Sequence, residues 1–242
     1  MNVSHHASKA IAPVLQTLFR KLVVSCQARE GEPFRDPESQ AKFAVSAVDG
    51  GAAGIRAHGA DDVRAIRRVV SVPIIGIRKI MQDDGRVLIT PTLESARELV
   101  EAGAEMIAMD VTSRGQRKGA IERIQRIKAE LNVPILADIA TLDEAMAAAD
   151  AGADAVLSTM RGYTDDTADI QSFDFEFVGD LARRSPVPVL AEGRIHTPEQ
   201  ARAALDVGAY AVIVGSAITR PVTIARRFVC AIGGLEKGGI PV

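Results

Sequence analysis

The chain has 242 residues, of which 47% are hydrophobic and only 4% are aromatic, and its formal net charge is -2. This length is enough for one sizeable core, so we expect a single domain over residues 1–242. The small net charge gives no electrostatic reason to expect nucleic acid or an anionic membrane as the main partner, and no segment approaches the roughly 20 apolar residues of a membrane span. A small-molecule partner is favoured.

The predicted elements alternate between helix and strand along the chain, after a first helix expected within residues 1–20. Three segments that align without a gap, 92–110, 141–159 and 197–215, each predict a helix with a threonine N-cap, a glycine stop and a strand. A second repeated unit, Val-Pro followed by apolar residues, predicts strand starts, because proline holds the preceding residue extended. The eight predicted strands are 22–27, 52–57, 73–77, 106–110, 134–138, 155–159, 188–192 and 211–215.

Eight strand-helix units in about 250 residues are typical of a (β/α)8 barrel, the TIM barrel. We therefore predict an α/β protein of this fold, with the helix of residues 1–20 closing the barrel bottom. An open doubly wound sheet is the alternative, but it would usually carry a G-x-G-x-x-G after the first strand, and none is present there.

The numbers and spacing of cysteines and histidines indicate the redox environment of the protein and whether it binds a metal ion. Cys26 and Cys230 are too few for a disulfide framework, so a reduced, cytoplasmic location is expected. The four histidines have no metal-ligand spacing and no metal motif occurs, so no metal is predicted.

Polar residues follow the predicted strands at the end where TIM barrels carry their active sites. These residues are Gln27, Arg56, Lys79, Asp110, Asp138, the stretch 161–164, the run 192–194, and Gly215 with Ser216. Lys79, Asp138 and Glu192 are the strongest candidates, because a charge directly after a buried strand needs a partner or a ligand. Arg161, Arg194 and Asp110 are equally well explained as solvated loop residues.

The loops after the last two strands predict a phosphate site. TIM barrels often bind phosphate between these loops and the N-terminus of a short extra helix. Glycines would let the backbone approach the anion, and Arg220 would add a planar positive charge. The predicted phosphate-binding residues are Gly193, Arg194, Gly215 and Ser216. The expected substrate is a phosphorylated small molecule.

The sequence resembles the N-acetylmannosamine-6-phosphate 2-epimerases of sialic acid catabolism. The resemblance rests on VSCQA (24–28), GIRA (54–57), VVSVPIIGIRK (69–79), ITPT (89–92), AMDVTSR (108–114), GYTDDT (162–167), AEGR (191–194) and VGSAITRP (214–221). It implies cofactor-free interconversion of the 6-phosphates of N-acetylmannosamine and N-acetylglucosamine by inversion at C2. Carried onto the matching positions, Lys79 would be the catalytic lysine and Glu192 the catalytic acid. The implied substrate-binding residues are Gln27, Arg56, Asp138 and Arg220.

Two departures and two rival functions remain open beside this resemblance. Ala140 replaces a serine common in the family, and the loop TSRGQRK departs from the family pattern, which leaves the role of residues 114–118 open. The basic stretch SRGQRKGA (113–120) is expected to be a solvated surface loop, with a lid as the alternative. Lys79 could instead form a Schiff base, as in a lyase or aldolase acting on a phosphorylated sugar. A non-catalytic phosphosugar-binding barrel is the second rival. Alanine-rich outer helices also leave a homodimer open.

Overall fold

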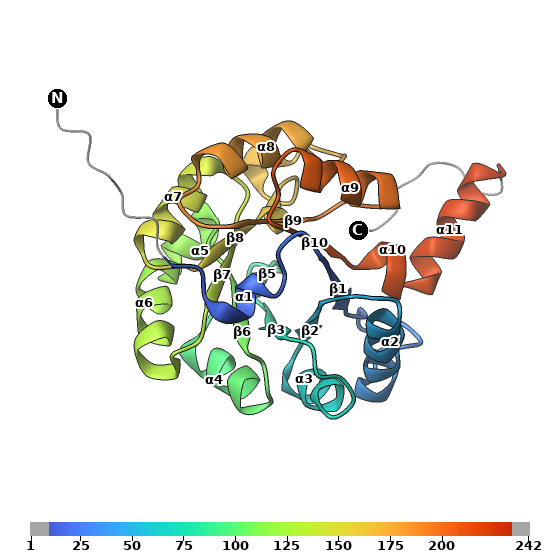
Figure 1. Ribbon diagram of the computed structural model, residues 1–242, viewed down its shortest axis with the longest axis horizontal. Coiled ribbons are helices and arrows are strands. Elements are labelled where there is room, and N and C mark those ends of the chain that lie inside the picture. Colours follow the sequence, from blue (N-terminus) through green and yellow to red (C-terminus); the bar gives the residue numbers. More distant parts are fainter. Residues whose placement is uncertain (1–9, 234–242) are drawn as a thin grey trace.

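Eight parallel strands close into a barrel in the computed structural model, which describes residues 10–233 (Figure 1). The strands are β1 (Leu22–Cys26), β2 (Gly54–His58), β3 (Ile74–Ile77), β6 (Met106–Asp110), β7 (Ile135–Asp138), β8 (Ala155–Leu157), β9 (Val189–Glu192) and β10 (Ala211–Val214). They follow one another round the ring in chain order, and β10 pairs with β1 to close it. The predicted TIM barrel is therefore confirmed, and all eight predicted strands are present with small changes in their bounds.

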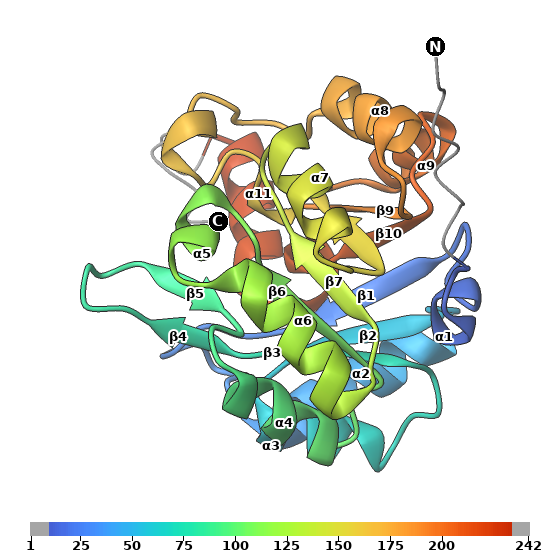
Figure 2. The same cartoon turned by 90° about the vertical axis from the view of Figure 1, so that its left-hand side faces the viewer.

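Helices surround the barrel, as the two perpendicular views in Figures 1 and 2 show. The longer ones are α2 (Pro37–Asp49), α3 (Ala60–Arg67), α4 (Leu93–Glu101), α6 (Ala120–Leu131), α7 (Leu142–Asp150), α8 (Phe175–Arg184), α9 (Pro198–Asp206) and α11 (Pro221–Ala231). Shorter pieces are α1 (Pro13–Gln16), α5 (Ser113–Arg117), α10 (Ser216–Thr219) and the 3-10 turns η1 (Ser158–Met160) and η2 (Asp165–Thr167).

The three repeated segments fold as the sequence predicted. Thr92, Thr141 and Thr197 each accept a hydrogen bond from the backbone amide of the third helical residue, which closes a capping box. Such a cap contributes about 1 kcal/mol to helix stability. Each helix then ends before a glycine with a positive φ angle: Gly103 at +108°, Gly152 at +106° and Gly208 at +112°.

Inward and outward side chains alternate along the strands and form two separate apolar clusters. Outward residues pack against the helices, and inward residues fill the lower part of the barrel. Leu15 and Leu18, in and just after α1, are fully buried in the inner cluster, so this segment covers the barrel bottom. The helix there has four residues, Pro13–Gln16, rather than the predicted twenty, and residues 1–9 of that prediction lie outside the described residues.

An antiparallel hairpin follows β3 and was not predicted. Its strands are β4 (Lys79–Met81) and β5 (Val87–Ile89), and it projects from the barrel in Figure 2. Thr90 anchors its base: the buried hydroxyl group accepts from the Arg78 amide at 3.1 Å and donates to the Ala108 carbonyl at 2.7 Å. The hairpin places Lys79 two residues beyond the end of β3.

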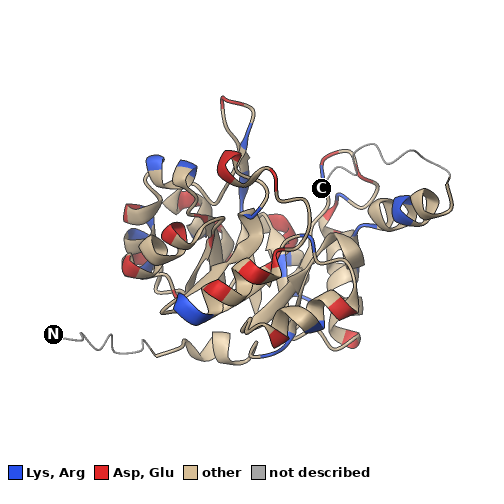
Figure 3. Cartoon of the chain, turned by 90° about the horizontal axis from the view of Figure 1, so that it is seen from above, with Lys and Arg blue, Asp and Glu red and all other residues tan. Residues whose placement is uncertain are grey.

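The surface carries charges of both signs, interspersed over the outer helices (Figure 3). No helix among residues 10–233 is long and apolar enough to cross a membrane.

Candidate active site

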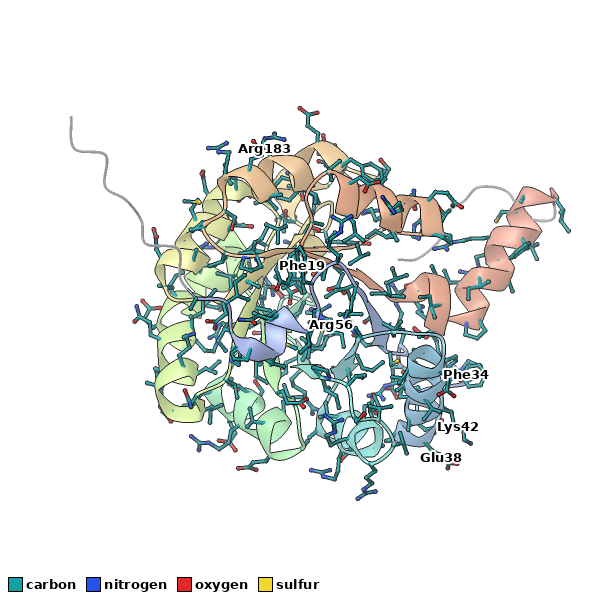
Figure 4. All side chains as sticks on the ribbon, viewed as in Figure 1. Phe19, Phe34, Glu38, Lys42, Arg56 and Arg183 are labelled. Carbon is teal, nitrogen blue, oxygen red and sulfur yellow. The ribbon has the colours of Figure 1, made fainter. Side chains whose placement is uncertain are left out.

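Three charged side chains enter the barrel interior because strand residues alternate with a period of two. Leu136 in β7 and Leu190 in β9 belong to the inner apolar cluster. Asp138 and Glu192 come two positions later in the same strands, at their carboxyl ends, so both face the same interior. Arg56 of β2 joins them, and Figure 4 shows it near the centre of the barrel. The sequence pattern had identified all three.

Arg56 binds both carboxylates at once. Its Nη1 donates to Oε1 of Glu192 at 2.6 Å, and its Nη2 donates to Oδ1 and Oδ2 of Asp138 at 2.8 and 2.7 Å. The side chains of Arg56 and Asp138 are 2% and 0% exposed, and that of Glu192 is 11% exposed. Water therefore screens these ion pairs weakly, and the three groups form one buried, hydrogen-bonded unit.

Burial raises the pKa of both carboxyl groups above the ordinary range, although Arg56 opposes the rise in each case. A second effect raises the pKa of Glu192: the Asp138 carboxylate lies close by, and two like charges resist being present together. Glu192 is therefore a carboxyl group that holds a proton more readily than an ordinary glutamate does. A carboxyl group whose pKa is raised can serve as a proton donor as well as an acceptor, which is what proton transfer requires.

Lys79 follows β3, and four places separate β3 from β9, the strand of Glu192, so these two strands stand on opposite sides of the eight-stranded ring. The pKa of Lys79 is lowered from 10.5 to about 8, first by desolvation and then by Arg56, while Glu192 and Asp138 oppose the change. The residue as a whole is exposed, so solvent reaches it although the surrounding protein desolvates its ammonium group. The Lys79 backbone amide donates to Nδ1 of His58 at 3.2 Å, which steadies this position.

Two neighbouring residues of η1, Ser158 and Thr159, position Glu192, and sequence reasoning missed both. Thr159 donates from Oγ1 to Oε2 of Glu192 at 3.1 Å. The Ser158 hydroxyl donates to the Glu192 carbonyl at 2.9 Å and accepts from its amide at 3.0 Å. Thr159 comes two positions after Leu157, an inner-cluster residue, so the same alternation that identified Glu192 could have found it.

Gln27 lies at the end of β1, where its Nε2 donates to Oγ of Ser25 at 2.6 Å. The Oε1 atom of Gln27 is buried and has no hydrogen-bond partner among residues 10–233. The Nε atom of Arg56 is also buried and also lacks a partner among these residues. Buried polar atoms normally find a partner. The Gln27 oxygen could accept a hydrogen bond from a bound polar molecule, and the Arg56 nitrogen could donate one to it.

The residues predicted to bind phosphate lie next to Glu192. Glu192 pairs with Ile213 of β10, so Gly193 and Gly215 directly follow two neighbouring strands. Gly193 has a φ of +100°, which a side chain would strain, and a Cβ on Gly215 would lie 3.2 Å from Cβ of Ser25. Ser216 begins α10 directly after Gly215.

Comparisons with known proteins place this architecture in a family. Residues 40–234 match the family described as "Putative N-acetylmannosamine-6-phosphate epimerase". The chain belongs to this epimerase family.

Individual relatives of this epimerase family match over most of their length. The "Putative N-acetylmannosamine-6-phosphate 2-epimerase" of Caldanaerobacter subterraneus subsp. tengcongensis is 44% identical over 222 residues, which cover 90% of this chain and 94% of that protein. The solved structure of the N-acetylmannosamine-6-phosphate 2-epimerase from Clostridium perfringens has a TM-score of 0.85 and 39% identity, and the match covers 95% of this chain and all of the other. Thiamine phosphate pyrophosphorylase from Pyrococcus furiosus shares only the fold, with a TM-score of 0.59 and 17% identity.

In this member of the epimerase family, the two arginines predicted at the phosphate site are engaged with protein atoms. Arg194 donates from Nη2 to the Gly162 carbonyl at 2.9 Å, and its guanidinium group lies 4.4 Å from the ring centroid of Tyr163. Arg220 forms an ion pair with Glu32, a residue that sequence reasoning missed. That either arginine binds phosphate stays a prediction.

The lid candidate, residues 113–120, contacts the hairpin through Arg114. Arg114 donates to the Asp84 carboxylate at 2.8 Å and to the Val87 carbonyl at 3.1 Å. It therefore joins the loop after β6 to the segment that carries Lys79. Ala140, the departure from the family's serine, is buried just before α7. Its backbone amide donates to Oε2 of Glu144 in the first turn of that helix, at 2.8 Å.

Proposed function

We propose that this chain catalyses the reversible 2-epimerisation of N-acetylmannosamine 6-phosphate to N-acetylglucosamine 6-phosphate, with Lys79 and Glu192 exchanging protons at C2. The observation that carries the proposal is the placement of two groups with opposite pKa changes on opposite sides of one barrel mouth. The pKa of Lys79 is lowered to about 8 and that of Glu192 is raised. Two such groups on the two faces of a carbon atom allow inversion by proton exchange, one removing the proton and the other returning one.

The chemistry follows from the substrate. Ring opening exposes an aldehyde at C1, which acidifies the C2 proton. One group removes this proton, the other returns a proton to the opposite face, and the sugar closes as its epimer. Lys79 can act as a base once it is neutral, and Glu192 can supply a proton once it is protonated. Gln27, Arg56 and Asp138 would contact the sugar, while Gly193, Gly215, Ser216 and Arg220 would hold the phosphate.

Proton exchange in deuterated water tests this proposal. The enzyme is incubated with N-acetylmannosamine 6-phosphate and followed by NMR. Deuterium should appear at C2 of both epimers as the second one accumulates. Lys79→Met should abolish this exchange while the phosphosugar still binds; turnover by that variant would refute the role of Lys79.

A Schiff-base reaction at Lys79 is the rival that shares most of these residues. A lysine with a pKa of about 8 is also a competent amine nucleophile. Borohydride added with substrate distinguishes the two, because it would trap an imine as a permanent adduct on Lys79. The proton-transfer proposal expects no mass increase of the protein. A non-catalytic sugar sensor would show binding without deuterium exchange.

We also propose that two copies pair through α11, in the reduced environment of the cytoplasm. This helix lies outside the ring of helices in Figure 1, and Thr223 is its only buried residue. Val222, Phe228 and Ile232 are 43%, 71% and 83% exposed. A second copy would cover this apolar face. Phe228→Asp should convert a dimer to monomers in light scattering; a wild-type monomer would contradict the proposal.

A further inference from the structure

The carboxylate of Glu32 is bound in a way that resembles the binding of an anionic ligand. The Nε atom of Arg220 donates to its two oxygens at 3.0 and 3.2 Å, and Nη2 of Arg220 donates to Oε1. The backbone amide of Arg29 donates to Oε2 at 2.9 Å. A guanidinium fork with an added backbone N–H group is the donor set that proteins use for phosphate and carboxylate.

This pair lies on the phosphate side of the barrel mouth. Glu32 is in the loop after β1, and Arg220 follows α10, which begins directly after Gly215. The two segments are joined, since Oγ1 of Thr219 donates to the Ser25 carbonyl at 2.8 Å. The Glu32 carboxylate is therefore bound to the same arginine that is predicted to bind the substrate's phosphate.

The positive charges around Glu32 exceed its single negative charge, so another anion could take its place. Burial and then Arg220 lower the pKa of Arg29, so two guanidinium groups lie near one carboxylate. The three side chains of Arg29, Arg220 and Glu32 together carry a net charge of +1. The side chains of Arg220 and Glu32 are 11% and 19% exposed, so solvent reaches the edge of the pair. A phosphate dianion carries more charge and more acceptor oxygens than a carboxylate, and it would hold the two arginines more strongly.

We propose that Glu32 is a specificity residue that occupies Arg220 until a phosphoryl dianion displaces it, so that monoanions are excluded from the site. The inference rests on the proposed function, because it takes the phosphate of the sugar as the displacing group. A carboxylate monoanion offers Arg220 no more charge than Glu32 already does, and the intramolecular carboxylate has the advantage of high effective concentration. Only a dianion gains by the exchange.

Titration calorimetry with inorganic phosphate and with acetate tests the inference without turnover. In Glu32→Gln, phosphate should bind about fivefold more tightly, the size expected for loss of one competing ion pair near the surface. Acetate, which wild type should bind at least about tenfold more weakly than phosphate, should become a ligand of the variant. The matched control is Glu30→Gln, which removes an exposed charge from the same loop and should leave both affinities unchanged.

The opposite sign would overturn the inference. If Glu32 only positions Arg220, phosphate should bind Glu32→Gln more weakly; unchanged affinity would show that the two anions do not compete. In an Arg220→Ala background, Glu32→Gln should have no effect, and a persistent gain would also count against the idea. If Glu32→Gln does not fold, equal affinity of wild type for acetate and phosphate is sufficient to reject it. Absence of deuterium exchange at C2 would refute the epimerase proposal and leave these titrations unaffected.

Discussion

Replacing Arg56 by methionine would leave two buried carboxylates without their common partner. The guanidinium group donates three hydrogen bonds of 2.6 to 2.8 Å to Asp138 and Glu192, in a place where the three side chains are at most 11% exposed. Removing one member of a buried ion pair typically costs about 3–5 kcal/mol of unfolding free energy. Since such a domain is stable by about 5–15 kcal/mol, Arg56→Met should be folded but markedly weakened.

The loss should depend on pH with a definite sign. Burial raises the pKa of both carboxyl groups in the folded state, so folding favours their protonated forms and their contribution to stability falls as pH rises through the raised pKa. Without Arg56, which holds both pKa values down, the folded-state values rise further. Each tenfold increase in proton affinity adds about 1.4 kcal/mol to the deficit. The deficit of Arg56→Met should therefore be larger at pH 8 than at pH 5.

Urea unfolding followed by circular dichroism at both pH values measures this deficit. The matched control is Arg97→Met, because Arg97 pairs with Glu130 at 3.0 Å where the side chains are 39% and 40% exposed. Its loss should stay below about 1 kcal/mol at either pH. A deficit for Arg56→Met equal to that of the control, or one that is larger at pH 5, would refute the reasoning about the buried carboxylates.

Three further predictions concern the site and the scaffold. The kcat/KM for N-acetylmannosamine 6-phosphate should rise with pH through about 8, because Lys79 must lose its proton to act as a base; a pH-rate profile that is flat between 7 and 9 would exclude this role. Arg220→Ala should raise KM about tenfold or more with a smaller change in kcat, as steady-state kinetics would measure, whereas an unchanged KM would remove Arg220 from the phosphate site. Thr141→Ala should lower the unfolding free energy by about 1 kcal/mol through loss of the α7 cap, and Thr141→Ser should recover most of it; equal unfolding midpoints for all three proteins would contradict the capping role.

The barrel could be predicted because its signals are local. Threonine caps, glycine stops and Val-Pro strand starts each act within a few residues, and they recur in register along the chain. The hairpin of β4 and β5 was missed because its strands have three residues each and lack an alternating pattern. The short α1 likewise departs from the predicted helix, since Pro13 sets its start and the chain turns after Gln16.

The positions of the candidate site were also available from the sequence, because a charged residue directly after a buried strand is easily recognised. A period of two further determines that Arg56, Asp138 and Glu192 face inward, since each continues an inward row of its strand. The sequence thus determined that these three charged side chains face the barrel interior, and from which strands they come.

Only the tertiary structure decided how these side chains pair. Arg56 bonds to partners 82 and 136 residues away, and Arg220 to one 188 residues away. The choice of partner depends on closure of the ring, on rotamers and on the burial of each charge, none of which has a local signature. For this reason the ion pair of Glu32 with Arg220 was not foreseen. The alternation along the strand could have placed Thr159 in the mouth, but not its hydrogen bond to Glu192.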